Sequence, residues 1–214
     1  MTTHIYAFGS ICRGDIARDS DVDLLALVAS RDDRFDPEAY SIYSYKRIRV
    51  LWNEGNPFAW HLACESRLLY SSNQADHLKQ LGDPKPYKKC AADCRKFRDL
   101  YRAGIQSIMA GGRSTLFDLS MVFLSIRNIA TCYSLGLTRA PNFSRRSALQ
   151  LGPASVPLSE ESYRILERAR ILCTRGCGTG LNKNETGRVV RELEPVDLWM
   201  TTLVEGAECH ERVQ

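Results

Sequence analysis

The sequence predicts an α+β protein, with a mixed sheet and flanking helices first and an all-helical bundle behind them. Three observations lead to this prediction. Short apolar runs separated by turns dominate residues 1–86, whereas apolar residues at helical spacing fill residues 87–214. Between them, QLGDPKPY (80–87) contains two prolines and a glycine, a composition typical of a linker. We therefore expect two domains, residues 1–86 and 87–214.

The first domain is expected to begin with two strands joined by a short turn. Residues 4–8 (HIYAF) predict a buried strand that stops at Gly9-Ser10. Residues 10–18 predict a short helix or turn interrupted by Gly14. Residues 21–29 (DVDLLALVA) give the strongest strand signal in the chain, because they are apolar and β-branched toward their far end.

A third strand and a helix are expected to complete this domain. Residues 40–52 (YSIYSYKRIRVLW) alternate with period two, which predicts a strand with one solvent-facing side. Asn56 as N-cap and Pro57 at the first helical position predict a helix that runs over about residues 58–70.

Everything after the linker is expected to be helical. The apolar residues keep helical spacing, Ser114 and Ser159 are expected to cap helix starts, and the second helix is apolar nearly all round. That second helix is therefore expected to be the central, most buried element. The expected helices are 88–111, 115–136, one that starts at Ser159 and ends near 175–180, and about 184–204.

Composition and charge exclude several classes of protein. The 214 residues are 44% hydrophobic and 25% charged, which excludes a disordered, fibrous or collagen-like chain. The net charge of +4 is smaller than a dedicated nucleic-acid binder would carry. Residues 1–86 contain 10 Lys/Arg and 12 Asp/Glu, whereas residues 87–214 contain 19 and 13. The second domain is thus better suited to hold an anion, although solvated, arginine-rich helix faces would give the same count.

The expected cellular location is based on membrane-span, signal-peptide and cysteine patterns. The sequence contains no stretch of 18 apolar residues, so we expect no membrane span. MTTHIYAFGS does not have the composition of a signal peptide. We expect a cytoplasmic protein whose 8 cysteines are thiols. Cys90/Cys94 and Cys173/Cys177 have CxxxC spacing, which on a helix places both sulfurs on one face. Burial in helix cores is the favoured interpretation, with a zinc site as the alternative.

The segment around Gly9 has the composition of an anion-binding turn. Gly9 follows a strand, and its missing side chain lets an anion approach the backbone N–H groups. Ser10 adds a hydroxyl donor, and the forked cation of Arg13 can reach the same anion. These residues predict a cradle for phosphate groups.

Asp21 and Asp23 supply the negative charge that such a site needs for a metal. They stand two residues apart on a strand, so both carboxylates leave the same face, roughly 6.6 Å apart along the backbone. Two hard oxygen ligands beside a phosphate cradle can hold Mg²⁺. A tight turn before two solvated aspartates is the structural alternative, but like charges on one face weaken a sheet.

The pattern G-S, ten residues, then D-V-D resembles the signature of the DNA polymerase β-type nucleotidyltransferase superfamily. GSICRGDIARDSDVDLLALV resembles the small bacterial nucleotidyltransferase-domain proteins, including Arg13 and Ser20. The resemblance is close over about 20 residues, and the expected topology extends it to about residue 86. It implies a nucleotidyltransferase-like first domain, with Asp21 and Asp23 as metal ligands and Gly9, Ser10, Arg13 and Ser20 at the nucleotide.

One feature of that superfamily is missing from its expected place. A third carboxylate usually stands on a neighbouring strand, as metal ligand and general base, but residues 40–52 contain no Asp or Glu. The nearby acids are Asp36, Glu38, Glu54 and Glu65. Glu65 shares a helix face with His61 and is our candidate for the third catalytic carboxylate, with a structural role as the alternative for both.

The second domain offers cations without a clear site. Lys88 is a candidate to reach a triphosphate, with a solvated charge run as the favoured alternative. Arg127-Asn128 begins a motif found in ribonucleases that accompany small nucleotidyltransferases, but no histidine closes it, so we reject that activity. Arg145-Arg146 and residues 175–178 are candidates to contact an acceptor.

Two functions remain. The first is Mg²⁺-dependent transfer of a nucleotidyl group from a nucleoside triphosphate such as ATP to a hydroxyl of a small molecule, protein or RNA, with release of pyrophosphate. The alternative is a nucleotide-binding regulatory module, or half of a toxin–antitoxin or defence pair, with weak or no transferase activity. We expect no membrane partner and allow for a homo-oligomer. A nucleic-acid-binding helical protein is disfavoured, because residues 87–214 show no aromatic-interleaved basic patch.

Overall fold

The computed structural model describes residues 2–15, 22–30, 32–112, 114–138 and 140–213. The chain divides into two compact units, Met1–Lys88 and Lys89–Gln214. The first holds a mixed four-stranded sheet with helices, and the second is helical, which confirms the predicted fold class.

The sheet of the first unit has the strand order β3-β2-β1-β4. β1 (Thr3–Phe8) pairs antiparallel with both β2 (Asp23–Val28) and β4 (Ser66–Ser71), and β2 pairs parallel with β3 (Tyr40–Ser44). In this register Phe8 lies opposite Asp23 on one side and Ser66 on the other. The end of β1 therefore brings the Gly9 turn beside the first residue of β2.

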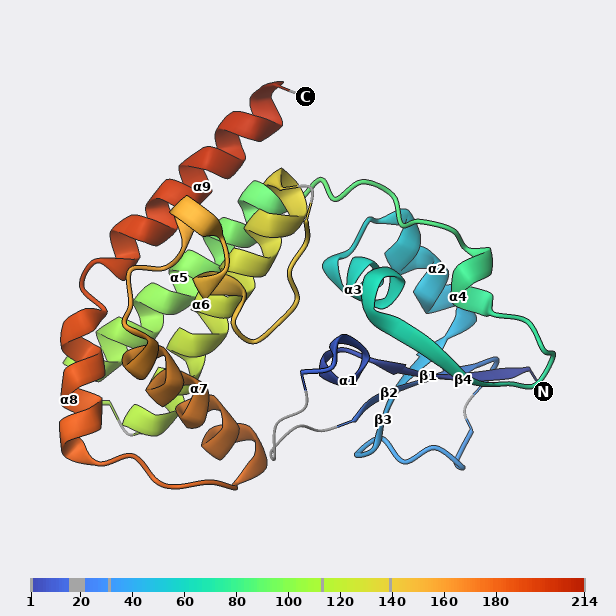
Figure 1. Ribbon diagram of the computed structural model, residues 1–214, viewed down its shortest axis with the longest axis horizontal. Coiled ribbons are helices and arrows are strands. Elements are labelled where there is room, and N and C mark those ends of the chain that lie inside the picture. The colour runs from blue at the N-terminus through green and yellow to red at the C-terminus, as the bar shows by residue number, and fades with distance from the viewer. Residues whose placement is uncertain (1, 16–21, 31, 113, 139, 214) are drawn as a thin grey trace. The chain divides into compact units, whose positions relative to one another are not determined.

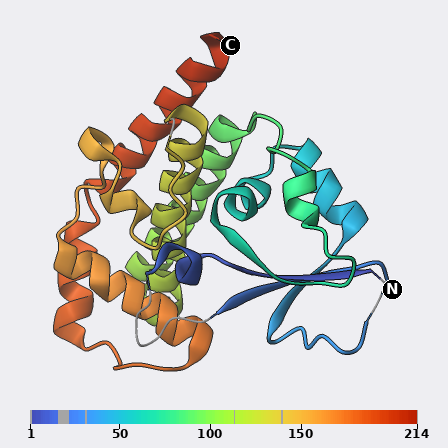
Figure 2. The same ribbon diagram turned by 45° about the vertical axis from the view of Figure 1, so that its right-hand side comes forward.

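Helices cover one face of this sheet (Figures 1 and 2). They are α2 (Tyr45–Asn53), α3 (Pro57–Glu65) and α4 (His77–Gln80), whereas α1 (Ser10–Arg13) follows β1 directly. Alternate strand residues point toward these helices, as the period of two requires. The resulting core consists of Tyr6, Phe8, Leu25, Leu27, Ile48, Leu51, Trp52, Ala59, Leu62 and Leu78.

The prediction of one strand over residues 40–52 is wrong beyond Ser44. The side chain of Ser44 accepts a hydrogen bond of 3.1 Å from the backbone N–H of Arg47 and so caps α2. Ile48, Leu51 and Trp52 are buried at helical spacing. This spacing overrides the strand-like alternation after the first five residues, which do form β3.

The predicted helix over residues 58–70 also ends too late. Asn56 does cap α3, and Pro57 is its first residue, but the helix stops at Glu65 and the chain enters β4. The free edge of β1 supplies hydrogen-bonding partners for β4, and this pairing joins segments far apart in the sequence. The periodicity of a segment cannot predict pairing with a strand that is distant in the sequence.

The second unit is a helical bundle. Its helices are α5 (Cys90–Met109), α6 (Thr115–Leu137), α7 (Glu160–Arg175), α8 (Lys183–Glu192) and α9 (Val196–Val213). Short 3₁₀ turns, η1 (Ser147–Leu149) and η2 (Gly152–Ala154), lie between α6 and α7. Within the described ranges no strand follows Lys88, as predicted. Ser114 and Ser159 cap α6 and α7 through their side chains, also as predicted.

The last predicted helix, about 184–204, is two helices. Pro195 separates α8 from α9, because proline has no N–H to donate and disfavours helical backbone in the residue before it. The break lets α8 pack on α7 while α9 packs on α5 and α6.

α6 packs against α5, α7 and α9 and forms the core of the bundle. Among the described helices it alone is long and apolar enough to span a membrane, but 61% of its most apolar window is buried inside the protein. Such burial is typical of a core helix in a soluble protein.

The two CxxxC pairs differ. Cys90 and Cys94 are buried as expected, with their sulfurs 4.0 Å apart, and the hydrogen bond and burial raise the pKa of Cys94 far above its usual range. Cys173 and Cys177 are exposed, so the expectation of burial is wrong for this pair. Cys177 lies outside α7, which ends at Arg175, and Cys173 lies in its last turn, beyond the buried residues that end at Ala169.

Candidate functional site

The candidate site lies at the end of β1, where Gly9 turns the chain into α1. Gly9 has a φ of +74° and a ψ of −137°, a conformation that residues with a side chain rarely adopt. Its backbone oxygen accepts hydrogen bonds from the N–H groups of Cys12 and Arg13, at 3.0 and 3.3 Å. Its own N–H donates to the backbone oxygen of Glu65, at 3.1 Å. The turn is therefore tied to the end of α3.

The carboxylate of Asp23 lies against Gly9. A Cβ atom placed on Gly9 would stand 2.9 Å from Oδ2 of Asp23 and 3.8 Å from Cε1 of His61. A side chain at position 9 would displace the carboxylate, so glycine lets Asp23 hold its present position. Asp23 is exposed and Ser10 half-buried, which leaves both accessible to a ligand. Sequence analysis placed all three residues in one site, and the structure brings Gly9 and Asp23 into contact distance.

Arg13, the last residue of α1, points its guanidinium at two carboxylates. Its Nη1 donates to Oε2 of Glu65, and its Nε donates to Oδ2 of Asp15 at 2.9 Å. Burial alone would lower the pKa of Arg13, but the hydrogen bond to Asp15 and the charge and hydrogen bond of Glu65 outweigh it and raise the pKa. The guanidinium stays charged in a largely enclosed position.

Glu65 also contacts His61. Nε2 of His61 lies 2.9 Å from Oε2 of Glu65, one turn away on α3. The imidazole packs edge-on against Phe8, with ring centroids 5.6 Å apart. The spacing of His61 and Glu65 in the sequence predicted this pair. It did not predict the contact of Glu65 with Arg13, or that of Arg13 with Asp15.

Part of the predicted site lies outside the described residues. Ser20 and Asp21 both fall in that segment, so their predicted places beside Ser10 and Asp23 stay predictions. Within the described ranges no three His, Cys, Asp or Glu side chains gather closely enough to hold a metal ion. Asp36 and Glu54 thus form no such cluster with Asp23, and Glu65 as third carboxylate stays a prediction.

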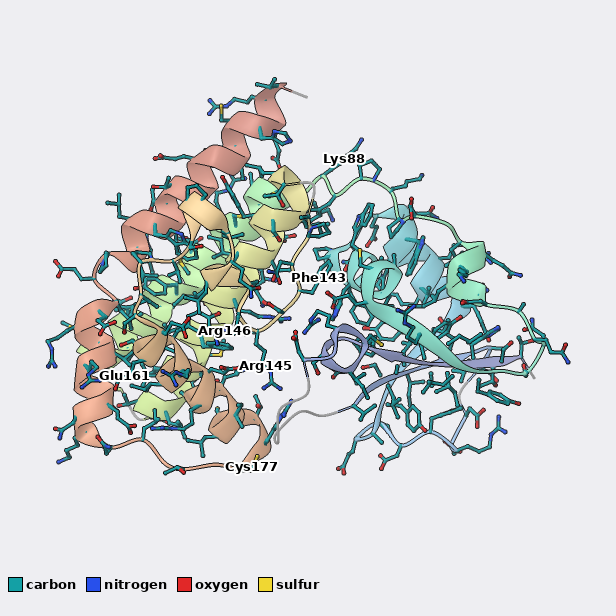
Figure 3. The ribbon with its side chains drawn as sticks, in the orientation of Figure 1. Lys88, Phe143, Arg145, Arg146, Glu161 and Cys177 are labelled. Carbon is teal, nitrogen blue, oxygen red and sulfur yellow. The ribbon has the colours of Figure 1, made fainter. Side chains whose placement is uncertain are left out.

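The cations predicted to bind nucleotide or acceptor differ in their contacts. Lys88 is exposed in the segment that leads into α5, and it makes no hydrogen bond or ion pair with a described residue (Figure 3). Arg146 is ion-paired with Glu160 at 2.7 Å, and Arg145 lies 3.8 Å from Glu167, both within the bundle.

Comparison with known proteins identifies the family of the first unit. Residues 2–85 match the family model of the nucleotidyltransferase domain. The first unit is therefore a nucleotidyltransferase domain, and its family supports nucleotidyl transfer as the general activity. The match does not extend into the helical unit. A search of curated proteins finds no match to the chain.

Proposed function

We propose that this protein is a Mg²⁺-dependent nucleotidyltransferase that moves a nucleotidyl group from a nucleoside triphosphate, such as ATP, to a hydroxyl acceptor and releases pyrophosphate. The observation that carries the proposal is the carboxylate of Asp23 set against Gly9, where a side chain at position 9 would displace it. Carboxylate oxygens are ligands that Mg²⁺ prefers.

The residues divide the work by their chemistry. In the proposal Asp21 and Asp23 hold Mg²⁺, and the Gly9–Ser10 turn binds the β- and γ-phosphates through a backbone N–H and the Ser10 hydroxyl. Arg13 stabilises the charge that builds up on the phosphates during transfer, because a fixed cation needs no reorganisation at that moment.

Ser20 and Lys88 have supporting roles in the proposal as further contacts to the nucleotide. Mg²⁺, when bound, would neutralise phosphate charge and help activate the acceptor hydroxyl. The chain's own residues orient the triphosphate so that its α-phosphorus faces that hydroxyl, and positioning alone supplies much of the acceleration in such reactions. The sequence predicts Glu65 as a third carboxylate, but the proposed metal site at Asp21 and Asp23 does not depend on it. A cytoplasmic location, with a small molecule, protein or RNA as acceptor, belongs to the same proposal.

A second candidate is the nucleotide-binding regulatory or toxin–antitoxin module with little transfer. The observations that favour it are that β3 (YSIYS) contains no Asp or Glu, and that the candidate third carboxylate, Glu65, is ion-paired with Arg13. Such a site would bind nucleotide and release it unchanged.

One experiment separates the two candidates. The purified protein is incubated with Mg²⁺, cell extract and each of the four nucleoside triphosphates labelled at the α-phosphate, and the label is followed into protein, RNA and small molecules. Asp23→Ala is the test variant, and Glu205→Gln, an exposed acid on α9, is the control. Mg²⁺-dependent labelling that Asp23→Ala abolishes supports the transferase. Binding without labelling supports the module, and absence of both overturns both.

A further inference from the structure

We infer that Glu65 is a positioning residue, which acts on the proposed nucleotide site by holding Arg13 there instead of binding the metal. This inference rests on the proposed function. In this inference the carboxylate of Glu65 orients the guanidinium of Arg13, which binds phosphate. A third catalytic carboxylate would instead be a ligand of the metal.

Glu65 contacts the Gly9–Arg13 segment, the proposed phosphate-binding turn, at two points. Its backbone oxygen accepts the N–H of Gly9 at 3.1 Å, where the turn begins. Its side-chain Oε2 accepts Nη1 of Arg13, where α1 ends. One residue at the end of α3 thus fixes both ends of the Gly9–Arg13 segment.

The segment needs such an attachment. α1 has only 4 residues, and an isolated turn of helix is unstable, because fixing its backbone costs more than its few hydrogen bonds return. The exposed fractions of the Arg13 and Glu65 side chains are 20% and 13%, so the ion pair is shielded from water and constrains the arginine more than a surface pair would.

The ion pairs leave part of Arg13 available for an anion. A guanidinium carries five N–H donors in a rigid fork. Asp15 takes Nε and Glu65 takes Nη1, whereas Nη2 has no ion pair within the described part of the chain. Arg13 is thus held through two of its three nitrogens, and Nη2 is left as an oriented donor for a phosphate.

The same oxygen of Glu65 is poorly suited to a metal. Oε2 already contacts Arg13 and lies 2.9 Å from Nε2 of His61. A divalent cation at this atom would meet the guanidinium at close range, and like charges in a shielded place repel strongly. His61, packed on Phe8, further fixes the carboxylate in its present direction.

The test measures two ligands separately: tripolyphosphate without metal, and Mn²⁺ without phosphate. Wild type, Glu65→Gln, Arg13→Gln and the double variant form a thermodynamic cycle, with Glu205→Gln as charge control. We expect each single variant to weaken tripolyphosphate binding about tenfold or more, and the double variant to be little weaker than either, because coupled partners are non-additive. Mn²⁺ affinity should change by less than about threefold in Glu65→Gln.

Two results would overturn the inference. One is additive loss of tripolyphosphate affinity in the double variant, and the other is a tenfold or larger loss of Mn²⁺ affinity in Glu65→Gln, which would make Glu65 a metal ligand. If Glu65→Gln does not fold, Glu65→Asp takes its place in the cycle, because the shorter side chain keeps the charge but withdraws the carboxylate from Arg13. Weaker tripolyphosphate binding with near-normal Mn²⁺ affinity in Glu65→Asp supports positioning, whereas a tenfold or larger loss of Mn²⁺ affinity shows a metal-binding carboxylate.

Failure of the proposed function gives a different pattern. Asp23→Ala is measured beside the cycle with the same two ligands. If it leaves Mn²⁺ binding unchanged, or if wild type binds neither ligand, the nucleotide site itself is wrong. If Asp23→Ala abolishes Mn²⁺ binding while the Glu65–Arg13 cycle is additive, the site stands and the positioning role alone fails.

Discussion

Replacing Gly9 with alanine tests the geometry of the site at its narrowest point. The new Cβ would stand 2.9 Å from Oδ2 of Asp23, so the carboxylate must rotate away from its present position. The backbone must also keep a φ of +74° and a ψ of −137° with a side chain attached. Both effects act on the site that we propose for metal and phosphate.

Gly14 provides a matched control on the same short helix. Its φ is +80°, and a Cβ there would meet no atom of a described residue within 4 Å. Gly14→Ala therefore carries only the left-handed backbone penalty, about 1 kcal/mol. Gly9→Ala adds a rarer backbone conformation and the displaced carboxylate, for a total of about 2–4 kcal/mol in the unfolding free energy of the first unit. Its Mg²⁺-dependent ATP affinity should fall about tenfold or more, the equivalent of about 1.4 kcal/mol.

Hydrogen exchange at the amides of β1 and β2 measures the stability of the first unit separately from the bundle, and calorimetric titration measures ATP binding. The expected result is a clear difference between Gly9→Ala and Gly14→Ala in both measurements. Equal stability of the two variants together with wild-type ATP affinity in Gly9→Ala would refute the packing of Asp23 against Gly9.

Three further predictions address the reaction, the core and pH. Asp23→Ala should lower pyrophosphate release about a thousandfold while changing the thermal midpoint little, because it removes an exposed acid; normal release would contradict the metal-ligand role. Ile126→Ala, at a fully buried position of α6, should lower the unfolding free energy of the bundle by about 2–5 kcal/mol in urea titration, and a loss below about 1 kcal/mol would contradict its core position. Burial, then the neighbouring charges of His4 and Arg49, lower the pKa of His77, so the unfolded chain takes up the proton first. The stability of the first unit should then be fully present above the unfolded pKa of about 6.5 and fall as the pH drops through it; hydrogen exchange should show a shallower fall in His77→Gln.

The parts of the fold that depend on local signals were predictable from the sequence. β1 and β2 carry short apolar runs bounded by turn residues, and the caps Asn56, Ser114 and Ser159 each begin the helix that they predict. The glycine and aspartate of the site were identified by their residue types and spacing. These features need no knowledge of a distant partner.

The errors occurred where a partner or one capping residue decided the structure. SRLLYS (66–71) is a strand because β1 has a free edge beside it, and the helical pattern of α3 runs on into it without a break. YKRIRVLWN (45–53) alternates like a strand, but Ser44 caps a helix there. The environment of Glu65 was likewise hidden, because Arg13 reaches it only after β1 and α3 have packed.

The most direct test of the nucleotide site is equilibrium binding of α-labelled ATP, CTP, GTP and UTP to wild type and Asp23→Ala, each with Mg²⁺ and with chelator. A Mg²⁺ site at Asp23 beside the Gly9 turn predicts that at least one triphosphate binds wild type in a Mg²⁺-dependent manner, and that Asp23→Ala with an intact fold loses this binding. Triphosphate binding that depends neither on Mg²⁺ nor on Asp23 would contradict it.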